Sequence, residues 1–191
     1  MRSSYQSQLE YGAIIDTVIF MQRSKRSIKN SNVLRVVEFG ILDGYSLERF
    51  ARHNAEIYAY DIFDKFQGNH ARRDDIEKHF SSYSNVYIEY GDFYMTYEKF
   101  EDNSIDILHI DIANNGDVAE FMFEHYMRKL KPDGIVIFEG GSEERDQVEW
   151  MRKYNKSHIC PIFKKHKDTG LYEIMTLGNM PSLTLVQKVN T

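Results

Sequence analysis

Residues 36–46 read VVEFGILDGYS, and this stretch indicates the fold of the chain. An apolar run leads into a tight turn with two glycines, Gly40 and Gly44. A second apolar run at 57–60 ends on an acid, Asp61. This acid lies about twenty residues past the glycines, the interval at which nucleotide-binding α/β units place a carboxylate on a ribose. The pattern therefore predicts a ligand that carries adenosine.

The composition indicates one globular domain. With 191 residues, of which 42% are hydrophobic, the chain can bury a sizeable core. Within the domain 1–191 we expect an N-terminal helix and linker (1–32), a cofactor-binding core (33–150) and C-terminal strands (151–191). The net charge of -5 argues against a general nucleic-acid binder. The single cysteine, Cys160, excludes an internal disulfide and fits a reducing compartment.

The sequence also indicates where the protein works. No apolar run reaches the roughly eighteen residues that a membrane helix needs. The N-terminus lacks a compact apolar stretch before a small-residue cleavage site, so we expect no secretory signal. The expected location is the cytoplasm, with no membrane partner.

Strand and helix patterns alternate along the chain. Strand-like runs are found at 34–39, 57–60, 85–90, 105–110, 135–138, 171–177 and 183–189. Helical patterns are found at 6–23, 46–54, 71–81, 94–100, 117–130 and 143–154. Alternation predicts a mainly parallel sheet with helices on both faces, and the short last connection predicts an antiparallel hairpin. The expected fold is a doubly wound, Rossmann-like α/β domain with seven strands.

Between these elements we expect a polar linker at 24–32 and a turn at 131–134, and we expect Ser142 to open the helix at 143–154. The wall around the acceptor is expected from the N-terminal helix, the loop 63–73 and the segment 159–170, none of which carries a readable motif.

Four of the five apolar runs in the first part of the chain are followed by acids at the place where ligands bind in an open parallel sheet. A pyrophosphate site would need a third glycine, but Leu42 occupies the middle of the turn. Acids flank the turn at Glu38 and Asp43. Negative charge disfavours phosphates and favours a cationic ligand, such as a sulfonium that also carries an ammonium group.

Five motifs in order resemble those of class I S-adenosylmethionine-dependent methyltransferases, most closely the branch of small-molecule O-methyltransferases. They lie at 38–46, 58–61, 91–92, 106–111 and 130–138. The resemblance covers about residues 33–150. It implies a cofactor site formed by Glu38, Gly40, Gly44, Asp61, Ile62, Asp92 and Phe93.

In that resemblance, Glu38 and Gly40 face the methionine portion of the cofactor, and Gly44 allows close packing at the helix start. Asp61 would accept hydrogen bonds from the ribose hydroxyls, with Ile62 packing on the adenine. Asp92 and Phe93 would lie beside the adenine amino group and ring.

The resemblance implies that Asp111 faces the reacting methyl and the acceptor. His109 is a second catalytic candidate on the same strand face, although a packed histidine is favoured at a position inside the sheet. Some relatives bind a divalent cation here, which makes Asp111 and Glu139 candidate ligands of Mg²⁺. Gly140 replaces the second acid of those relatives, and no histidine follows Asp111 closely.

The leading hypothesis is a methyltransferase that uses S-adenosylmethionine on a small molecule, such as a sugar or another hydroxylated metabolite. We expect a small-molecule acceptor and no nucleic-acid partner, and homo-oligomerisation is open. One alternative is a methyltransferase-like fold that serves as a binding or assembly module. Another is a nicotinamide-dependent enzyme.

Overall fold

The computed structural model describes residues 9–28, 33–53, 55–65, 72–178 and 180–189. Its strands form a seven-stranded sheet in the order β3-β2-β1-β4-β5-β7-β6. This order, with β7 antiparallel to its neighbours, confirms the expected Rossmann-like class. The chain consists of two compact units, residues 1–96 and residues 97–191.

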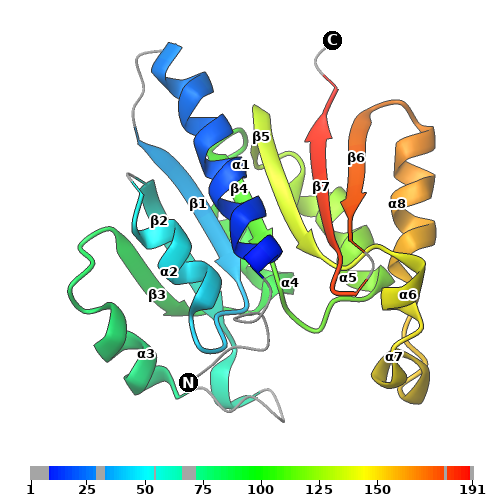
Figure 1. Ribbon diagram of the computed structural model, residues 1–191, viewed down its shortest axis with the longest axis horizontal. Helices are drawn as coiled ribbons and strands as arrows, with labels where there is room; N and C mark the ends of the chain where they lie inside the picture. Colours follow the sequence, from blue (N-terminus) through cyan, green and yellow to red (C-terminus); the bar gives the residue numbers. More distant parts are fainter. Residues whose placement is uncertain (1–8, 29–32, 54, 66–71, 179, 190–191) are drawn as a thin grey trace. The chain divides into compact units, whose positions relative to one another are not determined.

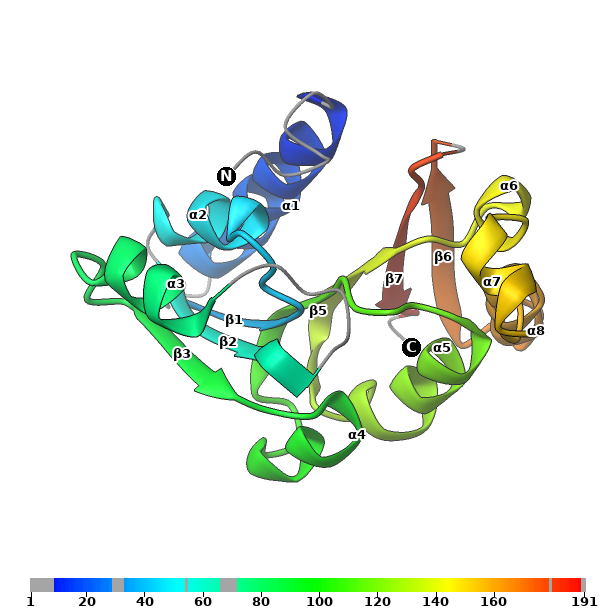
Figure 2. The same ribbon diagram turned by 90° about the horizontal axis from the view of Figure 1, so that it is seen from below.

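The first unit is a three-stranded parallel sheet with three helices on one face (Figures 1 and 2). The strands are β1 (Leu34–Phe39), β2 (Ala55–Asp61) and β3 (Val86–Tyr90). The helices on this face are α1 (Leu9–Ile28), α2 (Tyr45–Ala51) and α3 (Arg73–Phe80), and two short turns, η1 (Phe63–Lys65) and α4 (Phe93–Thr96), complete the unit. All but one of the β1 residues are buried, as expected of a strand covered on both faces.

Tyr60 lies at the centre of the aromatic packing in this unit. Its ring stacks on Phe39 with the two centroids 5.4 Å apart. Burial of the phenol raises its pKa to about 12, and the nearby Glu89 and Tyr58 add to the shift. Gly91 allows this packing, because a Cβ atom at that position would lie 2.5 Å from the Tyr60 ring.

The second unit contains the other four strands. They are β4 (Ile105–Ile110), β5 (Leu130–Glu139), β6 (Tyr172–Leu177) and β7 (Leu183–Lys188). β5 is parallel to β4 and antiparallel to β7, which forms a hairpin with β6, so the predicted terminal hairpin is confirmed. Every residue of β4 is buried.

Helical segments of the second unit connect and cover these strands. They are η2 (Tyr97–Lys99), α5 (Gly116–Phe121), the π-helical turn η3 (Met122–Tyr126), α6 (Glu143–Asp146), α7 (Glu149–Lys153) and α8 (Ile159–Asp168). α8 packs against α5 and β6 (Figure 2). No helix in the described ranges is both long enough and apolar enough to cross a membrane.

One local prediction in the first part of the chain needs correction. The linker predicted at 24–32 is helical as far as Ile28, where α1 ends. Ser24 is accommodated because its hydroxyl donates to the carbonyl of Phe20 within the helix. Residues 29–32 lie outside the described ranges, as do residues 6–8 of the predicted first helix.

Two predictions in the second unit were wrong in detail, and one helix had not been predicted. The expected turn at 131–134 lies inside β5, where the register with β4 shifts between Ile105 and Ile107. The helix expected at 143–154 is interrupted and forms α6 and α7. The segment 159–170, which carried no readable pattern, contains the ten-residue helix α8.

Candidate functional site

The turn after β1, called here the first glycine turn (residues 40–44), has the backbone geometry that its glycines permit. Gly40 and Gly44 have φ angles of 90° and 80°, a region that favours glycine. Gly44 is also the N-cap of α2, and a Cβ atom there would lie 2.7 Å from the Phe80 ring. Leu42 has a φ of 47°, so this position is left-handed without being glycine. The turn is therefore held in an unusual conformation.

The carboxylate of Asp61 holds the first glycine turn against the end of β2. Oδ2 accepts from the amide of Ile41 at 2.8 Å and from that of Leu42 at 3.4 Å. Oδ1 accepts from the amide of Phe63 at 2.6 Å. The side chain is buried, and carboxylate–amide hydrogen bonds of this kind are among the stronger ones in proteins. The structure thus shows Asp61 organising the turn, while its contact with a ribose stays a prediction.

Two further carboxylates lie next to the turn or within it. Glu38 is fully buried in β1 and accepts a hydrogen bond from the hydroxyl of Ser46, in the first turn of α2. Asp43 is half-buried, and its Oδ2 atom is buried with no hydrogen-bond partner among the described residues. A buried carboxylate oxygen without a donor is costly, so this position favours a ligand that brings a positive charge or a donor.

The other predicted cofactor residues also belong to the first unit. Asp92 is exposed, and its Oδ1 accepts from the amide of Tyr94 at 2.9 Å, which caps α4. Phe93 is buried and packs edge-on against Phe39, with centroids 5.2 Å apart. Ile62 is half-buried. The contacts of these three side chains with an adenine stay predictions.

The second unit contains the predicted catalytic residues. Asp111 directly follows β4 and is partly exposed. His109 lies inside β4 opposite Ile137 of β5, with 0% of its surface exposed. The position of His109 is that of a packed core histidine, and its catalytic role stays a prediction.

Glu139, the last residue of β5, forms a buried ion pair with Arg145 of α6. The guanidinium donates from Nε to Oε1 at 2.8 Å and from Nη2 to Oε2 at 2.9 Å. Both side chains are only 6% exposed, and the guanidinium also lies over the Trp150 ring. The positive charge of Arg145 is therefore directed to the acid at the end of β5.

This ion pair bears on the predicted magnesium site at Asp111 and Glu139. Mg²⁺ prefers anionic oxygen ligands, whereas both oxygens of Glu139 already accept from Arg145, whose positive charge opposes a second cation at this position. No group of three or more His, Cys, Asp or Glu side chains in the described part of the chain could hold a metal ion. The residues therefore do not fit the metal.

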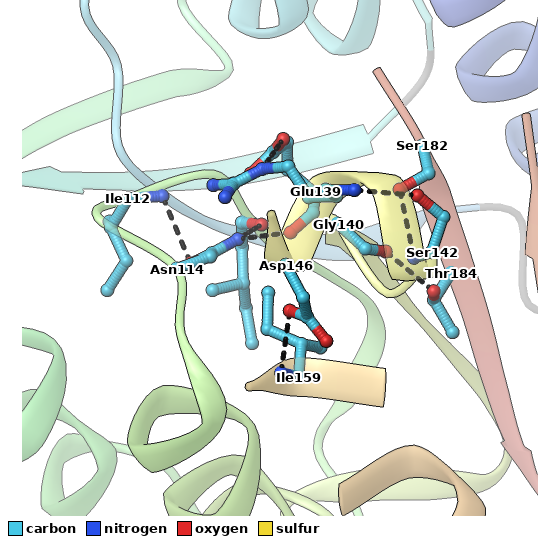
Figure 3. A network of polar contacts seen from close by, with 11 residues as sticks. Ile112, Asn114, Glu139, Gly140, Ser142, Asp146, Ile159, Ser182 and Thr184 are labelled. Atoms are coloured by element: carbon cyan, nitrogen blue, oxygen red, sulfur yellow. Dashed lines mark hydrogen bonds and ion pairs between the residues drawn. The ribbon is translucent and has the colours of Figure 1, made fainter. Parts of the chain in front are cut away.

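The glycine pair after β5, called here the second glycine turn (Gly140 and Gly141), is fastened to the start of β7 (Figure 3). The Thr184 hydroxyl donates to the carbonyl of Gly140 at 2.7 Å, and the amide of Gly140 donates to the carbonyl of Ser182 at 2.8 Å. A Cβ atom on Gly141 would lie 2.1 Å from Thr184 Oγ1. Ser142 caps α6 as predicted, because its side chain accepts from the amide of Arg145.

Sequence reasoning missed the partners of these acids rather than the acids themselves. Ser46 and Arg145 each lie on a short helix that follows the strand carrying the acid, eight and six residues later. A polar residue on such a helix, close in sequence to a buried acid, is the signal that could have found them. The loop 63–73 was expected to form part of the wall around the acceptor, and its residues 66–71 lie outside the described ranges.

Comparison with known proteins assigns the family. Residues 37–139 match the model of a methyltransferase domain family, which is more than half of the chain. The chain therefore belongs to this family of methyltransferases, enzymes that use S-adenosylmethionine. This result decides against the nicotinamide-dependent alternative. No curated protein sequence matches the chain.

Solved structures with the same fold share little sequence with the chain. A protein from Klebsiella pneumoniae assigned as an O-methyltransferase has a TM-score of 0.68 at 14% identity, covering 100% of this chain and 82% of that one. The Podospora anserina methyltransferase PaMTH1, bound to S-adenosylhomocysteine, has a TM-score of 0.66 at 16% identity, covering 100% and 80%.

The CurJ carbon methyltransferase has a TM-score of 0.58 at 14% identity over 82% of this chain. The chain spans about half, 49%, of that structure. The same fold thus occurs in proteins named for oxygen and for carbon methylation, and at these identities the comparison shows the fold alone.

Proposed function

We propose that this methyltransferase acts on a hydroxyl group of a small molecule, such as a sugar or another hydroxylated metabolite. The proposal is supported by the likeness to a protein assigned as an O-methyltransferase and by Asp111, a partly exposed acid directly after β4. The cytoplasmic location and any homo-oligomer stay predictions from the sequence.

The first glycine turn carries the cofactor part of this proposal. Glu38, Asp43 and Asp61 place three carboxylates around a turn whose backbone is already held in place. The orphaned Oδ2 of Asp43 provides a position where the positive charge of S-adenosylmethionine would be stabilised. We assign the binding of the methionine portion to Glu38, Gly40 and Asp43.

The chemistry of the proposed transfer is an in-line displacement. The acceptor oxygen forms a bond to the methyl carbon while the carbon–sulfur bond breaks, and its electron pair stays on sulfur as S-adenosylhomocysteine leaves. The hydroxyl proton needs a base, and we assign this role to Asp111. The protein otherwise contributes alignment of the two reactants and exclusion of water.

The test of the cofactor site compares S-adenosylmethionine with S-adenosylhomocysteine, which differ in the charge on sulfur. In calorimetry, wild-type protein should bind both. Asp43→Asn should weaken S-adenosylmethionine by about threefold to tenfold and leave S-adenosylhomocysteine nearly unchanged, because only the former is a sulfonium. Asp61→Asn should weaken both by about tenfold or more, because an amide group cannot accept from every amide of the turn.

The control for both variants is Asp74→Asn, which removes an exposed acid of α3 outside the turn. It should leave both affinities unchanged. Equal losses for the two ligands in Asp43→Asn would refute the charge argument, and no binding by folded wild-type protein would refute the cofactor site.

The assembly-module alternative has one observation in its favour, the Glu139–Arg145 ion pair at a position where the resemblance implied a metal-binding acid. A panel of sugars, phenols and other hydroxylated compounds, assayed with methyl-labelled cofactor, decides between the two. Any labelled product supports the methyltransferase, whereas cofactor binding without product across the panel supports the module.

A further inference from the structure

The side chain of Asn114 joins the carboxyl ends of β4 and β5 (Figure 3). Asn114 has 0% of its surface exposed. Its Nδ2 group donates to the carbonyl of Ile110 at 2.9 Å and to that of Glu139 at 2.8 Å. The last pair in the β4–β5 register is Ile110 with Phe138, so the amide group continues the connection just past the end of the ladder.

The same side chain also holds the residue after Asp111. The amide of Ile112 donates to Oδ1 of Asn114 at 3.4 Å, and the backbone amide of Asn114 donates to the carbonyl of Ile112 at 2.7 Å. Asp111 therefore lies between two residues, Ile110 and Ile112, whose backbone groups are both bound to Asn114. Its own backbone has little freedom to turn.

We propose that Asn114 is a positioning residue that sets the direction of the Asp111 carboxylate for methyl transfer. This inference rests on the proposed function, because it takes Asp111 as the base. An asparagine meets the need because one side chain supplies two donors and one acceptor, all of which are used here. Aspartate would supply acceptors only and would place them against two carbonyl oxygens, and alanine would leave the carbonyls unsatisfied.

The variants that test this role are Asn114→Ala and Asn114→Asp, with Asn115→Ala as the matched control. Asn115 is the neighbouring buried asparagine, and it caps α5 by accepting from the amides of Asp117 and Val118. Loss of the Asn115 side chain weakens the same loop but keeps the hydrogen bonds of the Asn114 side chain to Ile110, Ile112 and Glu139. All variants are made in the full chain and assayed below their melting temperatures.

The first readout needs no acceptor. NMR measures the rate at which the Ile112 amide hydrogen exchanges with solvent. This rate should rise by about tenfold or more in Asn114→Ala. It should stay near the wild-type value in Asn114→Asp, which keeps the acceptor oxygen, and should change little in Asn115→Ala. Unchanged exchange in Asn114→Ala would show that Asn114 does not hold this backbone and would overturn the proposal.

The second readout separates positioning from general stability. With the hydroxylated acceptor that wild type methylates fastest, kcat should fall by about tenfold or more in Asn114→Ala and Asn114→Asp, with KM and S-adenosylhomocysteine affinity unchanged. Asn115→Ala should keep its kcat. An equal loss of kcat in Asn115→Ala, or a wild-type kcat in Asn114→Ala, would overturn the positioning role. A wild-type protein without product on any acceptor would instead refute the proposed function.

Discussion

The two glycine turns occupy similar positions in the fold, but the acids beside them have different partners. Each comes after a buried strand that carries an acid, Glu38 in one case and Glu139 in the other. In the first, the acid accepts from a neutral hydroxyl, the backbone is held by Asp61, and Asp43 keeps an orphaned oxygen. In the second, the acid is neutralised by Arg145. The charge of Glu139 is thus compensated within the protein, whereas we propose that the acids of the first turn meet the positive charge of the cofactor.

The largest effect should come from breaking the ion pair at the second turn. Arg145→Met leaves the Glu139 carboxylate buried without its cation and should lower the free energy of unfolding by about 3–5 kcal/mol, measured by urea denaturation. Adding Glu139→Gln should restore much of the loss, because the buried charge is then gone.

The matched control is Lys165→Met. Lys165 lies 2.6 Å from Glu120 in a pair whose side chains are 60% and 28% exposed, and its loss should cost less than about 1 kcal/mol. Similar costs for the buried and the exposed pair would contradict the structural role assigned to the second turn.

Glycine-to-alanine substitutions compare the space around the glycines of the two turns through the stability that each substitution costs. Gly141→Ala should destabilise most, by about 3 kcal/mol or more, because its φ of 113° disfavours a side chain and the added Cβ meets Thr184 and Phe163. Gly44→Ala should cost about 2 kcal/mol, since the Phe80 ring can shift. Gly170→Ala, with φ 73° and open space, should cost about 1 kcal/mol, and urea denaturation that reverses this order would refute the comparison.

The smallest effect is expected from Tyr60, as a change in how stability depends on pH. The pKa of Tyr60 is raised to about 12 by burial, above the value of about 10 expected in the unfolded chain. The unfolded state therefore loses this proton first, so stability is fully present below pH 10 and falls as the pH rises from about 10 to about 12.

Tyr60→Phe removes this dependence and keeps the ring that packs on Phe39. Across that pH window the variant should gain on the order of 1–2 kcal/mol relative to wild type, measured by urea denaturation at several pH values. Tyr154→Phe, at an exposed tyrosine, is the control and should show no such gain. Parallel curves for wild type and Tyr60→Phe would show that Tyr60 does not cause the loss.

Strands were predictable where burial on both faces makes most of the run apolar. The limits of β1 and β4 agree with the prediction, and the hairpin of β6 and β7 was recognised by its short connection. α8 was missed because its sequence is short, contains Pro161 and is rich in lysine. Its first amides, those of Ile159 and Cys160, are capped by Asp146, which lies thirteen and fourteen residues earlier.

The sequence by itself determined the order of the seven strands, the first glycine turn and the acids after the strands, because local periodicity and glycine placement depend on neighbouring residues alone. Only the tertiary structure decided what each acid does. Asp61 holds the turn, Asp43 has an oxygen without a hydrogen-bond partner among the described residues, and Glu139 is neutralised by Arg145. A hydrogen bond or ion pair requires its donor to lie within about 3 Å of the acceptor oxygen. Tertiary packing sets that distance, and the linear sequence does not show it.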